Sequence, residues 1–162
     1  MERQCRMFLL LSRQILGIGV ALLPLRAADP IIGSWRLDTA GSKFVMPAPK
    51  EQTEVYRELA SGDIQLVLTR TQKDGVSTST TLTWPTAGGA VHDPAAALPK
   101  GDTIIETLLA PGDWLMTRLR NGTQYLTMHK LIGEDGKTMV QTIKAIGPRG
   151  RPVEQVQIFH RE

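Results

Sequence analysis

"DPIIGSWRLDTAGSKF", residues 29–44, follows a hydrophobic leader and has the alternating pattern of a β-strand. Ile31, Gly33, Trp35 and Leu37 share one face of such a strand, because successive side chains point to opposite sides. An indole on this face can plug one end of a closed barrel, and the glycine leaves room for a chain crossing. The stretch therefore predicts the first strand of a small β-barrel.

The residues before this stretch have the order of a secretory signal peptide. A basic start is followed by an apolar run over residues 15–23 and by the small pair Ala27-Ala28. An uncleaved membrane anchor is the alternative, but the run is far shorter than the ~20 apolar residues that a spanning helix needs. We therefore expect a signal peptide at 1–27, cleaved after Ala27 or Ala28, and a single barrel domain at 28–162.

The basic excess of the chain belongs to this leader. The chain has 19 Lys and Arg residues against 16 Asp and Glu. Four of these arginines and one glutamate precede Ala28, which leaves 15 basic and 15 acidic residues in the mature protein. A neutral mature chain gives no reason to expect a nucleic-acid partner, and we expect no stable membrane span after cleavage. The one cysteine, Cys5, also lies in the leader, so the mature protein has neither a disulfide nor a thiol nucleophile.

Turn signals recur through the mature chain at intervals of roughly 10–14 residues, which is typical of strands joined by hairpins. Short connections favour antiparallel neighbours, and closure of such a meander removes its exposed edges. The predicted fold is all-β: an antiparallel up-and-down meander of about 8–10 strands closed as a barrel, with a two-sheet sandwich as the open alternative. The expected strands are 32–37, 53–59, 64–71, 76–84, 90–92, 103–109, 114–120, 124–132, 138–146 and 153–160.

The segment "PTAGGAVHDPAAALPK", residues 85–100, is the least regular part of the chain. Its three prolines and its alanine run predict a loop that holds one short edge strand. The loop is either a plain connection or an overhang at the barrel mouth, where functional loops often lie.

The opening strand resembles that of the calycin superfamily, the lipocalins and fatty-acid-binding proteins. The chain as a whole is similar to small secreted bacterial lipocalin-like proteins, in which a "DGKT" hairpin, here 135–138, precedes the last two strands. The resemblance implies a lipocalin-like barrel closed by Gly33 and Trp35, with Arg161 on the last strand packed across the indole. The matching residues are Gly33, Trp35, Arg36, Leu37, Ser42 and Phe44.

Two departures limit this resemblance. The short stretch between Phe44 and Thr53 cannot form the helix-turn-helix lid of fatty-acid-binding proteins. The carboxylate-binding Arg-x-Tyr of that group aligns with Gln157 and Phe159, which cannot form an ion pair. Fatty-acid binding in the manner of that group is therefore not implied.

The candidate site lies on the hairpin around Asn121-Gly122. A two-residue turn there fixes the register and pairs positions whose numbers sum to 243. One face is then mainly apolar, and burial preference favours it inside. The other face, if it points inward, lines a pocket with aromatic walls and a cation for an anionic ligand. Its candidate ligand-binding residues are Trp114, Met116, Arg118, Tyr125 and His129.

Motifs for catalysis or metal binding are missing. The histidines His92, His129 and His160 lack the spacings that pair metal ligands on one element. No nucleophile elbow, phosphate-binding glycine loop or close carboxylate pair is present. We therefore expect no cofactor, no metal and no enzymatic activity.

These observations predict a secreted or periplasmic barrel that binds a small apolar or amphipathic ligand in its lumen. The alternative is a filled barrel that binds a protein or a surface through its loops. Since a barrel of this size can be packed solid or hold one ligand, the volume of the lumen separates the two.

Overall fold

The computed structural model describes residues 27–92, 98–147 and 150–162, and these form β-strands with turns between them. The predicted signal peptide lies outside the described residues except for Ala27. The strands are β1 (Gly33–Lys43), β2 (Glu51–Glu58), β3 (Asp63–Thr71), β4 (Ser77–Pro85), β5 (Gly89–Ala90), β6 (Asp102–Ala110), β7 (Asp113–Arg120), β8 (Thr123–Ile132), β9 (Thr138–Ile146) and β10 (Pro152–Arg161).

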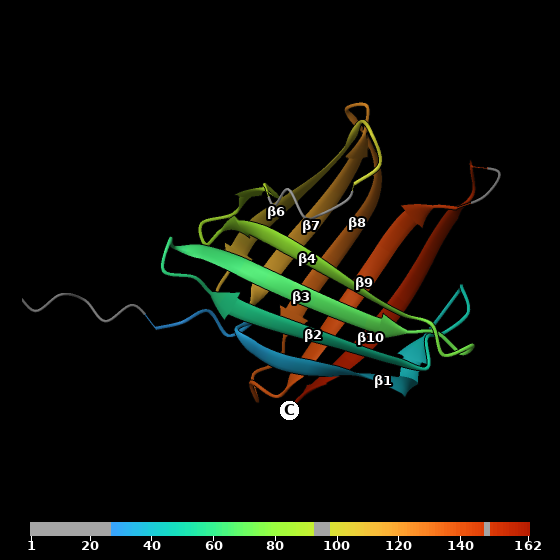
Figure 1. The fold of residues 1–162 in the computed structure, drawn as a ribbon, viewed down its shortest axis with the longest axis horizontal. Helices are drawn as coiled ribbons and strands as arrows, with labels where there is room; N and C mark the ends of the chain where they lie inside the picture. The colour runs from blue at the N-terminus through green and yellow to red at the C-terminus, as the bar shows by residue number, and fades with distance from the viewer. Residues whose placement is uncertain (1–26, 93–97, 148–149) are drawn as a thin grey trace, which may run out of the picture.

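All ten strands belong to one antiparallel sheet, in the order β4-β3-β2-β1-β10-β9-β8-β7-β6-β5. The sheet curls on itself as a nearly closed barrel, in which β10 runs between β1 and β9 (Figure 1). The last strand of the chain therefore joins the first, and a seam remains between β4 and β5. The amide of His92 crosses this seam to the carbonyl of Thr83 at 3.0 Å. The predicted meander is confirmed, and a two-sheet sandwich is excluded.

Side chains close one end of the barrel, and the other end is open. β1 begins at the closed end, where Trp35 is completely buried and its indole nitrogen donates to the carbonyl of Ile31 at 2.8 Å. The Arg161 guanidinium lies 4.3 Å from the centre of the Trp35 ring. It also donates to the carbonyls of Ile32 and Gly136, at 2.8 and 2.7 Å. The expected contact between Arg161 and the indole is thus present in the structure.

Three aromatic rings form a layer inside the barrel next to Trp35 and Arg161, and we call this layer the aromatic floor. Trp84 packs edge-to-face against Tyr56 and against Trp114, with ring centres 6.3 and 6.1 Å apart. All three side chains are fully or almost fully buried. Such rings bury a large apolar area, which stabilises a core that has no disulfide in the described residues. The remaining buried hydrophobic residues are Ile31, Leu37, Ile64, Leu66, Leu82, Ile104, Met116, Met139 and Phe159.

The irregular segment 85–100 contains one short strand, as expected, although the strand is β5 at Gly89–Ala90 and not 90–92. The alanine run at 95–97 lies outside the described residues. Leu98 and Pro99, which follow it, reach the interior of the barrel at the open end. No helix in the described part of the chain is both long and apolar enough to cross a membrane.

Candidate functional site

The barrel encloses a cavity of about 490 Å³ above its aromatic floor. Residues from the inward faces of eight of the longer strands line it, because inward and outward side chains alternate along each strand. The lumen is therefore not filled by side chains. Its apolar wall consists mainly of Leu66, Leu68, Leu82, Ile104, Met116, Leu126, Met128, Ile143, Ala145 and Val153, with Val45 and Met46 at the open end.

The register of the β7–β8 hairpin differs from the prediction. The turn itself is as expected, with φ of 48° at Asn121 and 80° at Gly122, and Leu119 faces Gln124. A β-bulge then shifts the pairing by one residue, so that Arg118 lies opposite Leu126. The predicted pairs beyond this point, with numbers summing to 243, are therefore wrong, and the inward residues of β8 are even-numbered.

The structure divides the five candidate residues among four places. Met116 and Arg118 line the lumen. Trp114 lies below them in the aromatic floor, with no solvent exposure. His129 pairs across the hairpin with Leu115, on the other face of β8 from the cavity-lining Met128 and Lys130, and its ring lies 2.6 Å from the Asp113 carboxylate. Its contact with a lumenal ligand is thus not supported by its position.

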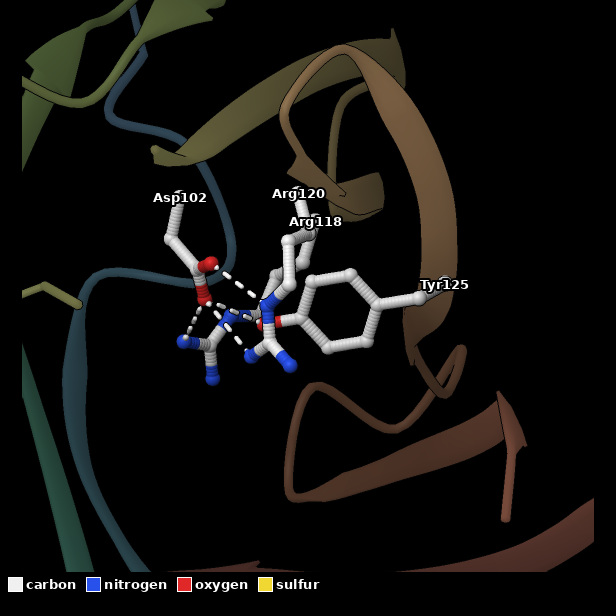
Figure 2. Close-up of polar contacts among 4 residues, drawn as sticks. All are labelled: Asp102, Arg118, Arg120 and Tyr125. Carbon is white, nitrogen blue, oxygen red and sulfur yellow. Dashed lines mark hydrogen bonds and ion pairs between the residues drawn. The ribbon is translucent and has the colours of Figure 1, made fainter. Parts of the chain in front are cut away.

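Tyr125 is the extra residue of the bulge, and its side chain joins a polar cluster at the barrel mouth (Figure 2). We define the Asp102 cluster as Asp102, Arg118, Arg120 and Tyr125. The Tyr125 hydroxyl donates to the Asp102 carboxylate at 2.7 Å, and Arg120 Nε donates to it at 2.9 Å. Arg118 Nη2 lies 3.4 Å from the same carboxylate. A bulge commonly redirects a side chain in this way.

The Asp102 cluster holds one carboxylate between two guanidinium groups. The pKa of Asp102 falls from its ordinary value of 3.8 to about 2, mainly because Arg120 and then Tyr125 donate hydrogen bonds to the charged form. The cluster has two guanidinium groups for one carboxylate, and Arg118 lines the cavity with 28% of its side chain exposed. Arg118 can therefore still bind an anion.

A second polar group lies at the deep end of the lumen, and we call it the lumen base: Glu54, Tyr56, Glu106 and Lys130. Each of these residues lines the cavity and is at most 2% exposed. The Tyr56 hydroxyl donates to Glu54 at 2.6 Å, while Lys130 Nζ lies 2.8 and 3.0 Å from the two oxygens of Glu106.

Burial gives the lumen base unusual electrostatics. It raises the pKa of Glu106 above its ordinary value of 4.5, and the nearby Glu54 raises it further, while Lys130 opposes the change. Burial also raises the pKa of Tyr56. Sequence reasoning missed this base because it assigned apolar side chains to the inward positions. The alternating polar positions 52 and 54 before Tyr56 were the available signal.

Other polar groups give no indication of a metal centre. Within residues 27–92, 98–147 and 150–162, no group of three or more His, Cys, Asp or Glu side chains is arranged to hold a metal ion. The described histidines instead lie near single carboxylates, as His160 does beside Asp38 at 3.5 Å.

Comparison with known proteins gives structural neighbours only. No protein-family model matches the chain, and no curated protein matches it in sequence. The fluorescent protein UnaG is similar in structure, with a TM-score of 0.57 and 15% identity over 82% of this chain and 97% of UnaG. The zebrafish ileal bile acid-binding protein, solved with cholic acid, has a TM-score of 0.53 and 11% identity over 82% of this chain and 99% of its own. At these identities the likeness concerns the fold.

Proposed function

Because the chain has the calycin barrel fold, we propose that it is a binding protein, and that it holds one small apolar or amphipathic ligand in its lumen. The observation that carries this proposal is the cavity of about 490 Å³ inside the barrel. Its volume falls within the range of ~300–1,000 Å³ that is usual for small-molecule sites. The neighbour solved with cholic acid shows that a related barrel accepts an amphipathic molecule.

The lining of the cavity supports an amphipathic ligand over a purely apolar one. Leu68, Met128 and Ile143 supply an apolar wall, whose burial against a ligand supplies the main driving force. Arg70 and Arg118 lie among the lining residues toward the open end. In this proposal the wall holds the apolar body and Arg118, supported by Tyr125 through Asp102, holds an anionic group. His129 has no part in it.

The cavity also disfavours the alternative of a filled barrel that acts only through its loops, because that function requires no lumen. Two features support a binding function over a catalytic one. The sequence has no catalytic motif, and the site is mainly apolar. The chemistry available in the lumen is recognition by burial and by hydrogen bonds.

Binding can be tested with the amphipathic fluorophore anilinonaphthalene sulfonate. We expect its fluorescence to rise on binding to the purified protein. The variant Met128→Trp, which places an indole inside the lumen, should weaken binding at least ~10-fold, since it removes space that the probe occupies. Native mass spectrometry of protein purified from its own host should also show a co-purifying small molecule.

Leu131→Trp is the matched control, because Leu131 lies on the same strand and is 45% exposed outside the barrel. It should leave binding of the fluorophore unchanged. Equal loss in both tryptophan variants, or no binding by the parent protein together with no co-purifying molecule, would argue against a lumenal site.

We also propose that the protein acts outside the cytoplasm, in the periplasm or as a secreted protein. The support is the order of basic, apolar and small residues in the leader. Intact mass measurement of the exported protein should show a mature chain that begins at Ala28 or Asp29. A chain that keeps its leader after export would contradict this.

A further inference from the structure

The lumen base has more hydrogen-bond acceptors than donors. Glu54 accepts three hydrogen bonds, from Tyr56 at 2.6 Å, Gln141 at 2.7 Å and Gln52 at 2.9 Å. An ionised carboxylate offers about four lone-pair positions, so about one remains free. Gln141, although completely buried, has an Oε1 atom with no partner in the structure. Glu54, which lines the cavity, can therefore accept a further hydrogen bond.

The ion pair in the lumen base leaves a similar surplus. Glu106 accepts two hydrogen bonds from Lys130, and about two of its lone-pair positions stay open. The ammonium of Lys130 also faces the rings of Tyr56 and Trp84, at 5.7 and 5.2 Å. Formally, two carboxylates and one ammonium sum to one negative charge in the lumen base. Charge of this kind is costly to bury without a counter-charge.

The open end of the cavity has the opposite character. Arg70 and Arg118 line it, and 28% of the Arg118 side chain is exposed. The lumen is thus polarised along its axis, with acceptors at the deep end and guanidinium groups at the mouth. A ligand with its acid group at the deep end would meet two carboxylates.

We propose that the ligand carries a nitrogen donor, an ammonium or N–H group, that binds at the lumen base between Glu54 and Glu106. An acidic group on the same ligand lies at the mouth beside Arg118. This inference rests on the proposed lumenal function and specifies which end of the ligand is buried. Charge-assisted hydrogen bonds to the two carboxylates then supply the specificity, while the apolar wall supplies most of the affinity.

Three probes of equal chain length test the orientation: dodecylamine, dodecanol and dodecanoate, each titrated calorimetrically below its micelle concentration at neutral pH. We expect dodecylamine to bind at least ~10-fold more tightly than dodecanol, because only the amine supplies a charged donor to the lumen base, while dodecanoate binds with its carboxylate at the mouth beside Arg118. If dodecanol binds as tightly as dodecylamine, or more tightly, the inference fails while the lumenal function stands. If none of the three binds although anilinonaphthalene sulfonate does, the inference also fails. If no probe of either kind binds, the lumenal function itself fails.

The variant Glu54→Gln tests whether the preference for dodecylamine arises at the lumen base. It keeps the size of the side chain and removes its charge, so the preference for dodecylamine should fall at least ~5-fold. Glu58→Gln is the matched control, because Glu58 is an exposed glutamate on the same strand and does not line the cavity. Should Glu54→Gln fail to fold, Glu106→Gln provides the second variant. A preference for dodecylamine that is unchanged in the folded variant would overturn the assignment to the lumen base.

Discussion

A single glycine, Gly33, makes room for the arginine that covers the closed end. A Cβ at this position would lie 2.3 Å from Arg161 Nη1, and the φ of 143° is one that other residues rarely adopt. We expect Gly33→Ala to lower the free energy of unfolding by about 2–3 kcal/mol, because it combines backbone strain with displacement of the guanidinium. Urea unfolding measures this value.

Gly62 supplies the control for this substitution. Its φ is also positive, at 82°, but no atom lies within 4 Å of an added Cβ. Gly62→Ala should therefore cost only the left-handed backbone strain, about 1–2 kcal/mol. A cost for Gly33→Ala no larger than that for Gly62→Ala would mean that Arg161 needs no space there.

Asp102 makes a pH-dependent contribution to stability. Its pKa is about 2 in the folded protein against an ordinary 3.8, chiefly because Arg120 and Tyr125 donate hydrogen bonds to the carboxylate. A lowered folded pKa stabilises the protein above the unfolded value, and this stabilisation is lost as the pH falls from about 4 toward 2. We expect the difference in free energy of unfolding between the parent protein and Asp102→Asn to shrink between pH 5 and pH 2.5. Parallel pH profiles would contradict the role of Asp102.

At the scale of strands, local chemistry predicts turns better than register. Asn121-Gly122 was correctly predicted as a two-residue hairpin turn because both residues tolerate positive φ. The bulge at Tyr125 was missed, since an extra residue in a strand has no consistent sequence pattern. One shifted residue exchanges the two faces of β8, which is why Lys130 and Met128 face the lumen in place of His129.

The polar lumen base was unpredictable for a different reason. Glu106 and Lys130 are 24 positions apart in the sequence, and each alone resembles a solvated surface charge. Pairing of β6 and β8 with β7 places the two side chains on one face of the sheet, where they meet at 2.8 Å, and curling of the sheet removes both from water. By contrast, the contact between Trp35 and Arg161 was predicted. The resemblance of the first strand to the calycin superfamily implied an arginine on the last strand that packs across the indole.

At the scale of the whole barrel, the seam between β4 and β5 is the weakest part of the wall. β4 and β5 are the two edge strands of the sheet, and residues 77–82 of β4 have no paired strand on their second side. Backbone amides that lack such pairing open at low cost. The cavity lies behind this seam. Thr80 and Leu82 of β4 line it on one side of the seam, and Ile104 of β6 lines it on the other. A molecule bound in the cavity would therefore contact both sides at once.

Hydrogen exchange can show whether a ligand closes this seam. In the free protein, we expect the amides of residues 77–82 to exchange faster than those of β9 and β10, which are paired on both sides. Saturation with anilinonaphthalene sulfonate should slow exchange at 77–82, because opening the seam would then also expose the bound molecule to water. The Met128→Trp variant, whose affinity for the probe should be at least ~10-fold lower, should show less protection at the same probe concentration. Saturated binding without any slowing at 77–82 would place the probe outside the barrel, because a molecule bound to the outer surface loses nothing when the seam opens.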